Sequence, residues 1–187
     1  MFNNSEKFSS GKLSPELISI LGLGELGVEK ESLRVLESRL TQSSHPKGLG
    51  SALCNQYITT DFSEAQIEII TPPFSDKKSV LTFLDDIHHF VAQKIDKEIL
   101  WPFSMPPLIS SEEEIVVAEY GRSHLGLFKH IYRNGLANRY GKTMQAISGV
   151  HYNYSLPGSI WPIISNSDNS KDIRSELYFC MLRNVYR

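Results

Sequence analysis

The sequence has little that would direct the protein to an oxidising compartment or a membrane. It has only two cysteines, Cys54 and Cys180, far apart and outside any CxxC motif, which argues against a disulfide framework and a zinc knuckle. We expect two buried or half-buried thiols in a reducing compartment. No apolar run approaches the roughly 20 residues of a membrane span, and residues 1–7 show no apolar signal core. These absences predict a cytoplasmic protein with no membrane partner.

An excess of positive charge is also absent. Lysine and arginine total 19, aspartate and glutamate 21, and the formal net charge is −2, so we expect no nucleic-acid partner. Hydrophobic residues make up 41% and charged residues 21%, which argues against disorder, collagen-like repeats and a coiled coil. The 187 residues suffice for one domain or for part of a larger one.

The hydrophobic pattern predicts alternating strands and helices. A helix is expected to begin at Ser14 and Pro15 and to end at Gly22 and Gly24. Strands are predicted over residues 28–35, 57–61, 65–71 and 150–156, helices over 78–95, 126–139 and 170–187, and a loop over 36–52. Because the strands alternate polar and apolar residues, we predict an α+β fold with an antiparallel sheet and flanking helices.

The helices have predicted apolar faces. The helix over residues 78–95 should bury one stripe: Val80, Leu81, Leu84, Ile87, Val91 and Ile95. The helix over residues 126–139 should turn Leu127, Phe128, Ile131 and Leu136 inward, with Arg133 and Arg139 on a solvated face. The last helix reaches Arg187 with no C-cap, from which we expect the chain to be the front part of a longer protein.

Carboxylates gather on the predicted strands. Side chains alternate along a strand, so Glu29 and Glu31 share one side, as do Glu64, Gln66 and Glu68. Asp61 lies beside the second strand, and a third strand carries His151, Asn153 and Ser155 on one face. Each pattern alone is typical of a solvated face or a core histidine. Together they predict a site for Mg²⁺ or Mn²⁺ bridging ATP, because these cations favour oxygen ligands and substrate phosphates.

Several longer stretches resemble bacterial glutamate–cysteine ligases, also called γ-glutamylcysteine synthetases. They are residues 27–35, residues 58–65 running on to 72, residues 101–106, residues 132–145 and, as the most specific, residues 147–157. The likeness runs from about Gly27 to the C-terminus, yet it covers only the first part of the family's length. The resemblance implies a glutamine synthetase-like catalytic domain whose funnel-like sheet is incomplete here. It also implies that residues 1–187 are the N-terminal portion of that single larger domain.

The resemblance further implies a reaction and its substrates. ATP phosphorylates the γ-carboxylate of L-glutamate, and the amine of L-cysteine then attacks the acyl phosphate. The products are γ-glutamylcysteine, ADP and phosphate, in the first step of glutathione biosynthesis. ATP is therefore expected as a co-substrate and Mg²⁺ or Mn²⁺ as the cofactor. The sequence does not fix the oligomeric state.

The same resemblance implies roles for individual residues. Glu31, Asp61 and Glu68 resemble ligands of the metal nearer the amino-acid substrates, whereas Glu29 and His151 resemble ligands of the metals that bridge the ATP phosphates. Asn153 is expected at a phosphate, Tyr132 in the cysteine pocket, and Gln145 and Ser148 on the nucleotide or glutamate side. Glu64 is expected to support the metal ligands. Further ligands of the family lie beyond Arg187, so we expect residues 1–187 alone to be inactive.

Three other functions stay open at this point. One is a different ATP-dependent carboxylate–amine ligase or kinase of the same superfamily. Another is an inactive fragment with only a binding or structural role. The last is a metal-dependent hydrolase, which would release phosphate from ATP without requiring both amino acids.

Overall fold

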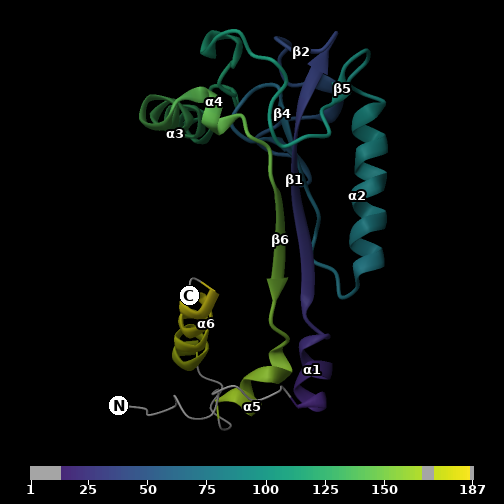
Figure 1. The fold of residues 1–187 in the computed structure, drawn as a ribbon, viewed down its shortest axis with the longest axis vertical. Helices are drawn as coiled ribbons and strands as arrows, with labels where there is room; N and C mark the ends of the chain where they lie inside the picture. The colour runs from purple at the N-terminus through teal and green to yellow at the C-terminus, as the bar shows by residue number, and fades with distance from the viewer. Residues whose placement is uncertain (1–13, 166–170, 186–187) are drawn as a thin grey trace. The chain divides into compact units, whose positions relative to one another are not determined.

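The computed structural model describes residues 14–165 and 171–185, which form two compact units. The larger unit comprises residues 26–153, and the smaller one combines residues up to 25 with residues from 154 onward. The ribbon in Figure 1 follows the chain through both. The predicted start of the last helix at Ser170 and its end at Arg187 lie outside the described residues. Among the described helices, none has the length and apolarity required to cross a membrane.

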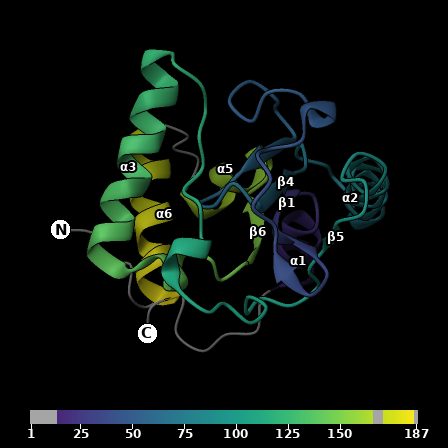
Figure 2. The ribbon, with the colours of Figure 1, turned by 90° about the horizontal axis from the view of Figure 1, so that it is seen from above.

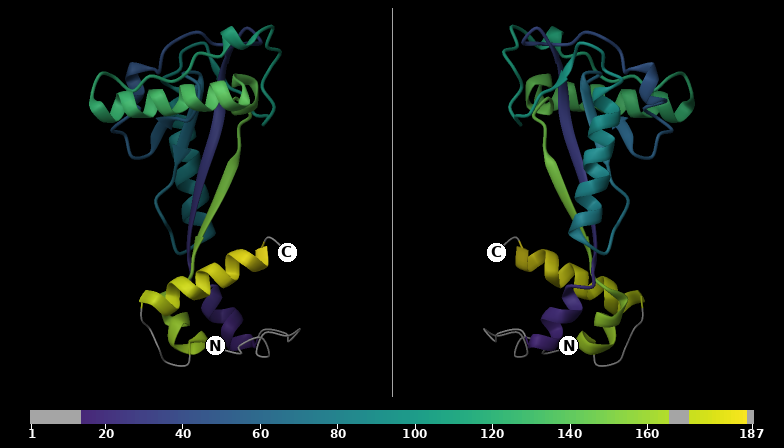
Figure 3. Two further views of the ribbon diagram at one scale, coloured as in Figure 1. Left: turned by 90° about the vertical axis from the view of Figure 1, so that its left-hand side faces the viewer. Right: turned by 90° about the vertical axis from the view of Figure 1, so that its right-hand side faces the viewer.

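An antiparallel sheet forms the centre of the larger unit. Its strands are β1 (Glu25–Leu36), β2 (Arg39–Leu40), β3 (Ile58–Thr60), β4 (Gln66–Ile70), β5 (Ile99–Leu100) and β6 (Val150–Ser155). The order along the sheet is β2-β1-β4-β3, and β5 and β6 also pair with β1. Figure 3 shows β1 and β6 as a long two-stranded ribbon. The antiparallel α+β prediction is confirmed.

The predicted strands agree closely with these bounds, but three regions differ, one of which is β5, a strand that was not predicted. β1 is longer than predicted because its start pairs outside the regular ladder, through an isolated antiparallel bridge between Leu26 and Phe74. The predicted loop over residues 36–52 contains β2 and a short 3₁₀ helix, Lys47–Leu49. Both additions are too short to show a hydrophobic period in the sequence.

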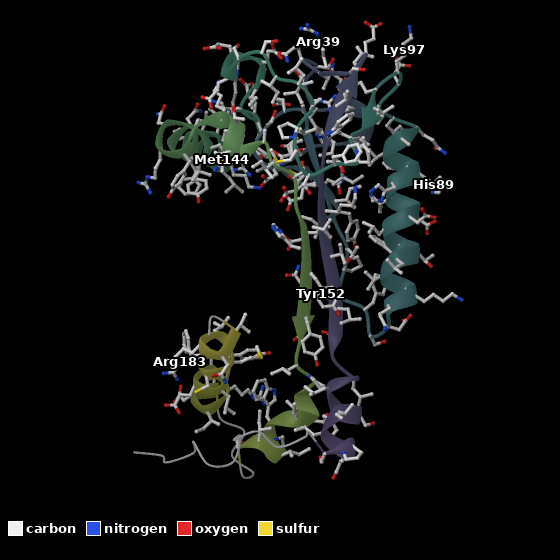
Figure 4. All side chains as sticks on the ribbon, in the orientation of Figure 1. Arg39, His89, Lys97, Met144, Tyr152 and Arg183 are labelled. Atoms are coloured by element: carbon white, nitrogen blue, oxygen red, sulfur yellow. The ribbon has the colours of Figure 1, made fainter. Side chains whose placement is uncertain are left out.

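Helix α2 (Lys77–Ala92) covers one face of the sheet. Asp76 caps it, since its side chain accepts a hydrogen bond from the Ser79 backbone N–H. Val91 of α2 belongs to a buried cluster with Leu49, Ile58, Ile67, Ile69 and Ile95, and Leu84 and Ile87 of the same helix pack against this cluster. Leu81 is 62% exposed, so that part of the predicted stripe was wrong. His89 lies on the side of α2 turned away from the sheet (Figure 4).

Helices α3 (His124–Tyr140) and α4 (Lys142–Gln145) lie on the opposite side of the sheet from α2, as the view in Figure 2 shows. Leu136 and Ala137 of α3 pack on a second buried cluster that includes Leu33, Phe62 and Ala146. Leu127, Phe128 and Ile131 are 47%, 67% and 67% exposed, so the predicted inward face of α3 was wrong at these positions. Within the described chain, no other element buries these three side chains.

The smaller unit is mainly helical. It holds α1 (Pro15–Leu21), the 3₁₀ helix Gly158–Ile160, α5 (Trp161–Ile164) and α6 (Lys171–Val185). The predicted cap is confirmed, because the Ser14 side chain accepts a hydrogen bond from the Leu17 backbone N–H. The Tyr154 hydroxyl donates to the Leu21 carbonyl at 2.6 Å. The close approach of this ring explains Gly24, where an added Cβ would collide with a Tyr154 ring carbon.

The two thiols contradict the sequence-based expectation. Cys54 and Cys180 are both free and both exposed, rather than buried or half-buried. Cysteine is commonly buried because it behaves as a small apolar residue, but here neither thiol belongs to a buried cluster among the described residues. The expectation of a protein without disulfides is unaffected.

Candidate metal centre

Glutamates lie opposite one another on the sheet face away from α2. In the antiparallel register of β1 and β4, Glu31 pairs directly with Glu68, and Glu29 pairs with Ile70. Directly opposed residues on antiparallel strands have their side chains on the same face. Because side chains alternate, Glu29 and Glu31 of β1 share that face with Glu68. Like charges placed this way destabilise a sheet, so the pairing favours a function other than stability.

The protonation of these carboxylates reflects their crowding. Burial, followed by the negative charges of Asp61, Glu29 and Glu31, raises the pKa of the Glu68 carboxyl to about 7. Burial also raises the pKa of Glu31, and Asp61 adds to that effect. The pKa of Asp61 is raised by burial too, although Arg133 and His151 oppose the shift. Each group therefore holds its proton more tightly than a free carboxyl, and a bound cation would relieve the repulsion.

Strand β6 brings His151 and Asn153 to the first of these glutamates. The Nδ1 atom of His151 lies 3.4 Å from Oε2 of Glu29, and the Asn153 amide donates to Oε1 of Glu29 at 3.0 Å. His151 and Asn153 thus both contact Glu29, the carboxylate that was predicted to lie near them at the ATP phosphates. The Asn153 amide faces Glu29, so it can orient this carboxylate.

Arg133 and Tyr120 contact the backbone at the end of β3, and sequence reasoning linked neither of them to Asp61. Arg133, expected on a solvated face, is half-buried and donates from Nε to the Asp61 carbonyl. Its guanidinium lies 4.7 Å from the centroid of the Tyr120 ring. The Tyr120 hydroxyl donates to the carbonyls of Thr60 and Asp61, at 2.6 and 2.9 Å. The positive charge of Arg133 therefore partly offsets the negative charge of Asp61 and Glu68. No local sequence signal links it to Asp61, which is 72 residues away.

Glu64 has a different environment from the other carboxylates. It is 8% exposed, and its oxygens accept hydrogen bonds from the backbone N–H groups of His45 and Glu119, at 2.8 and 2.6 Å. The carboxylate thus joins two loops. Glu64 was predicted to support the metal ligands, but its carboxylate makes no hydrogen bond to them among the described residues.

The predicted substrate residues are spread over α3, α4 and the segment before β6. Tyr132 is 58% exposed on α3, and Gln145 is half-buried at the end of α4. Ser148 is 4% exposed, and its Oγ lies 3.4 Å from the Gln66 side-chain nitrogen. Ser148 therefore contacts the same sheet face as the carboxylates, whereas Tyr132 and Gln145 make no hydrogen bond to them within the described chain.

The donor atoms suit a hard divalent cation, but the ligand set is not closed. The four carboxylates of Glu29, Glu31, Asp61 and Glu68 offer the oxygen ligands that Mg²⁺ and Mn²⁺ favour, and His151 adds a nitrogen beside Glu29. Within residues 14–165 and 171–185, however, no group of three or more His, Cys, Asp or Glu side chains is close enough to hold an ion by itself. Mg²⁺ commonly completes its shell with water and substrate phosphates, so an open set of this kind is compatible with it.

The sequence is similar to a family model and to curated proteins that are all described as glutamate–cysteine ligases. Residues 13–187 match the family model described as glutamate-cysteine ligase. A glutamate–cysteine ligase of Pseudomonas putida is 49% identical over 166 residues, which cover 86% of this chain and 32% of that protein. One from Edwardsiella ictaluri is 50% identical over 165 residues, with 86% and 32% covered. The chain thus spans about a third of the length of these relatives.

Two solved structures are similar as well. The crystal structure of glutamate–cysteine ligase from Francisella tularensis in complex with AMP has a TM-score of 0.73 and 38% identity, covering 79% of this chain and 30% of that one. A bifunctional glutathione synthetase from Pasteurella multocida has a TM-score of 0.77 and 32% identity, covering 89% and 22%. These likenesses confirm the glutamine synthetase-like fold class. With the family model matching almost the whole sequence, the chain belongs to the glutamate–cysteine ligase family.

Proposed function

We propose that residues 1–187 form the N-terminal part of an ATP-dependent glutamate–cysteine ligase and supply much of its metal site. One observation carries the proposal: Glu29, Glu31 and Glu68 lie on one sheet face, Asp61 is near enough to raise the pKa of Glu31 and Glu68, and His151 adjoins Glu29. Crowded carboxylates cost folding stability, and the binding of cations in a ligase of this family would account for them. The proposal that residues 1–187 are one part of a longer enzyme is supported by coverage: the chain spans only about a third of the length of its relatives.

The proposed reaction has two steps. The γ-phosphoryl group of ATP moves to the γ-carboxylate of L-glutamate, which leaves ADP and an acyl phosphate. The amine of L-cysteine then attacks the acyl carbon, the new amide bond forms, and phosphate departs as the nitrogen loses a proton. Phosphoryl transfer needs positioning and charge neutralisation more than covalent help from the protein. An acidic face suits that need only when it holds cations.

The roles of the residues follow from their positions. Glu31, Asp61 and Glu68 would hold a Mg²⁺ or Mn²⁺ ion near the amino-acid substrates, and Glu29 and His151 would hold the ions at the ATP phosphates. Bound there, the ions supply charge neutralisation and orientation of the transferred phosphoryl group. Asn153 keeps Glu29 oriented and adjoins the phosphate region. Arg133 restrains Asp61 by holding its carbonyl.

The remaining assignments are part of the same proposal. Tyr132 contributes to the cysteine pocket, and Gln145 and Ser148 contribute to the nucleotide or glutamate side. The exposed part of Tyr132 leaves it available to a substrate or to further parts of the protein. The proposed substrates are small molecules, and we propose a cytoplasmic location because ATP and the two amino acids are supplied there. We propose no nucleic-acid partner, in keeping with the net charge.

The test is ADP release by the complete encoded polypeptide with Mg²⁺, glutamate and cysteine, leaving out each amino acid in turn. We expect ADP only when both are present, and we expect Glu29→Gln or His151→Ala to abolish it. The chain limited to residues 1–187 should be inactive in the same assay. Phosphate release that needs neither amino acid would contradict the ligase proposal and support a hydrolase.

A further inference from the structure

Gln66 is a buried polar residue on the acidic face. It opens β4, pairs in register with Leu33 of β1, and has no exposed surface. A side-chain amide without solvent contact is unfavourable unless hydrogen bonds replace its water. An apolar residue would fill this position at lower cost, as Ile67 and Ile69 do on the other face. The hydrogen bonds of Gln66 therefore need an explanation.

One hydrogen bond from Gln66 and one from a backbone N–H end on the same carboxylate oxygen of Glu31. The Gln66 Nε2 group donates to Oε2 of Glu31 at 3.2 Å and lies 3.4 Å from the Ser148 hydroxyl. The backbone N–H of Gly149 donates to the same Oε2 atom at 3.0 Å. Two donors from different segments thus restrain one oxygen of Glu31. Within the described chain, no hydrogen bond ends on its second oxygen.

The orientation of the Gln66 amide is set by the carboxylate. Its Oε1 atom is buried and has no hydrogen-bond partner among the described residues. Turning the amide over would place that oxygen against the Glu31 carboxylate, where two acceptors repel each other. A buried acceptor left without a partner is a rare feature and needs a reason. Restraint of Glu31 supplies that reason.

We propose that Gln66 is a positioning residue, which fixes the Glu31 carboxylate so that its second oxygen is available to a divalent cation. This inference rests on the proposed metal site, but the residue acts on Glu31 and does not itself touch the cation. Partners that hold a metal ligand in place commonly change metal affinity about 10–100-fold when removed.

The test compares two buried polar residues on opposite faces of the sheet, Gln66, which contacts Glu31, and Thr60, which has no hydrogen bond to that carboxylate among the described residues. Gln66→Met keeps the length and apolar volume of the side chain but removes the donor. Thr60→Val is the matched control: Thr60 is 1% exposed on β3, and its hydroxyl has no partner among the described residues. In register it pairs with Ile67, on the α2 face. Valine preserves its shape. Circular dichroism establishes that both variants of the complete polypeptide fold.

The probe is Mn²⁺, followed by electron paramagnetic resonance of the free ion during a titration. We expect Gln66→Met to weaken the tightest Mn²⁺ binding about tenfold, and Thr60→Val to leave it within twofold. In the ligase assay, Gln66→Met should raise the Mg²⁺ concentration for half-maximal activity by a similar factor. Its kcat at saturating Mg²⁺ should stay within about threefold of the wild type. A general structural defect would lower kcat without this shift.

Two negative results have different meanings. If the wild-type protein binds Mn²⁺ and Gln66→Met binds it equally well, the positioning role is overturned and the metal site stands. If the wild-type protein binds no Mn²⁺, the metal site itself fails, and the role of Gln66 fails with it. If Gln66→Met does not fold, Gln66→Leu replaces it in the titration and is judged by the same two outcomes.

Discussion

The two faces of the β3–β4–β1 sheet are built from alternate residues of the same strands, yet one face is apolar and the other is acidic. On one face Ile58, Ile67 and Ile69 pack beneath α2 and are 2% exposed or less. On the other, Glu31 and Glu68 are directly opposed. The apolar face stabilises the fold, since each buried aliphatic side chain contributes roughly 1.5–3 kcal/mol. The acidic face costs stability, which indicates that it is maintained for what it binds.

The largest expected effect concerns the acidic face. We expect Glu31→Gln in the complete polypeptide to lower ligase turnover about a thousandfold, or roughly 4 kcal/mol of barrier, because a metal ligand is lost. The matched control is Asp85→Asn on α2, which removes the same charge from an exposed position and should leave turnover unchanged. Steady-state kinetics at saturating Mg²⁺ measures both. Equal activity in the two variants would remove the distinction between the faces.

The apolar face is tested by Ile67→Ala. We expect this variant to lose about 3 kcal/mol of unfolding free energy, because Ile67 has no exposed surface and alanine would leave a cavity against α2. Ile99→Ala is the control, since Ile99 is 55% exposed and the same atoms are removed. Urea unfolding measures both. A loss below about 0.5 kcal/mol for Ile67→Ala would mean that α2 does not close this face.

A smaller effect should appear in the pH dependence of stability. The pKa of Glu68 is raised from 4.5 to about 7, so the folded protein binds its proton more tightly than the unfolded chain does. The free energy of unfolding should therefore fall as the pH rises from about 4.5 to about 7. Glu68 is only half-buried, so solvent screening limits the change to about 1 kcal/mol.

Unfolding in urea at pH 5 and pH 8, with a chelator present, measures this dependence. Glu68→Gln should make the two stabilities more alike, whereas Glu37→Gln, at an exposed position, should retain the wild-type difference. Stability that rises between pH 5 and pH 8 in the wild type, and rises equally in Glu68→Gln, would contradict the account of crowded carboxylates.

The smallest expected effect separates two neighbours on α2. Leu81 is 62% exposed and Val80 is 4% exposed. Leu81→Ala should change the unfolding free energy by no more than about 0.5 kcal/mol, although it removes more carbon atoms. Val80→Ala should cost more than that. Thermal unfolding of the two variants settles the order, and the reverse order would place the apolar stripe of α2 elsewhere.

The local parts of the fold could be predicted from the sequence. Ser14 marks a helix start because its side chain can accept from the first turn, and Gly141 ends α3 with a φ of 81°, which favours glycine. The alternation in β1 and β4 was sufficient to place Glu29 with Glu31 and Gln66 with Glu68. These features depend on residues a few positions apart, so the sequence displays them directly.

Features that depend on contacts between distant segments could not be predicted from the sequence. The register that opposes Glu31 and Glu68, and the hydrogen bond from Arg133 to Asp61, depend on how distant segments pair. Phe128 and Ile131 were wrongly predicted to be buried, because an apolar stripe on a helix favours burial but does not show which element would cover it. The metal ligands were named through family resemblance, and their assignment stays a prediction.

The most direct test of the central claim is the crystal structure of the complete polypeptide grown with Mn²⁺ and a non-hydrolysable ATP analogue, read by the anomalous signal of manganese. We predict manganese within bonding distance of Glu31, Asp61 and Glu68, and more of it between Glu29, His151 and the phosphates. Manganese bound elsewhere, with these five side chains left free of it, would contradict the proposal that the acidic face is the metal centre of a ligase.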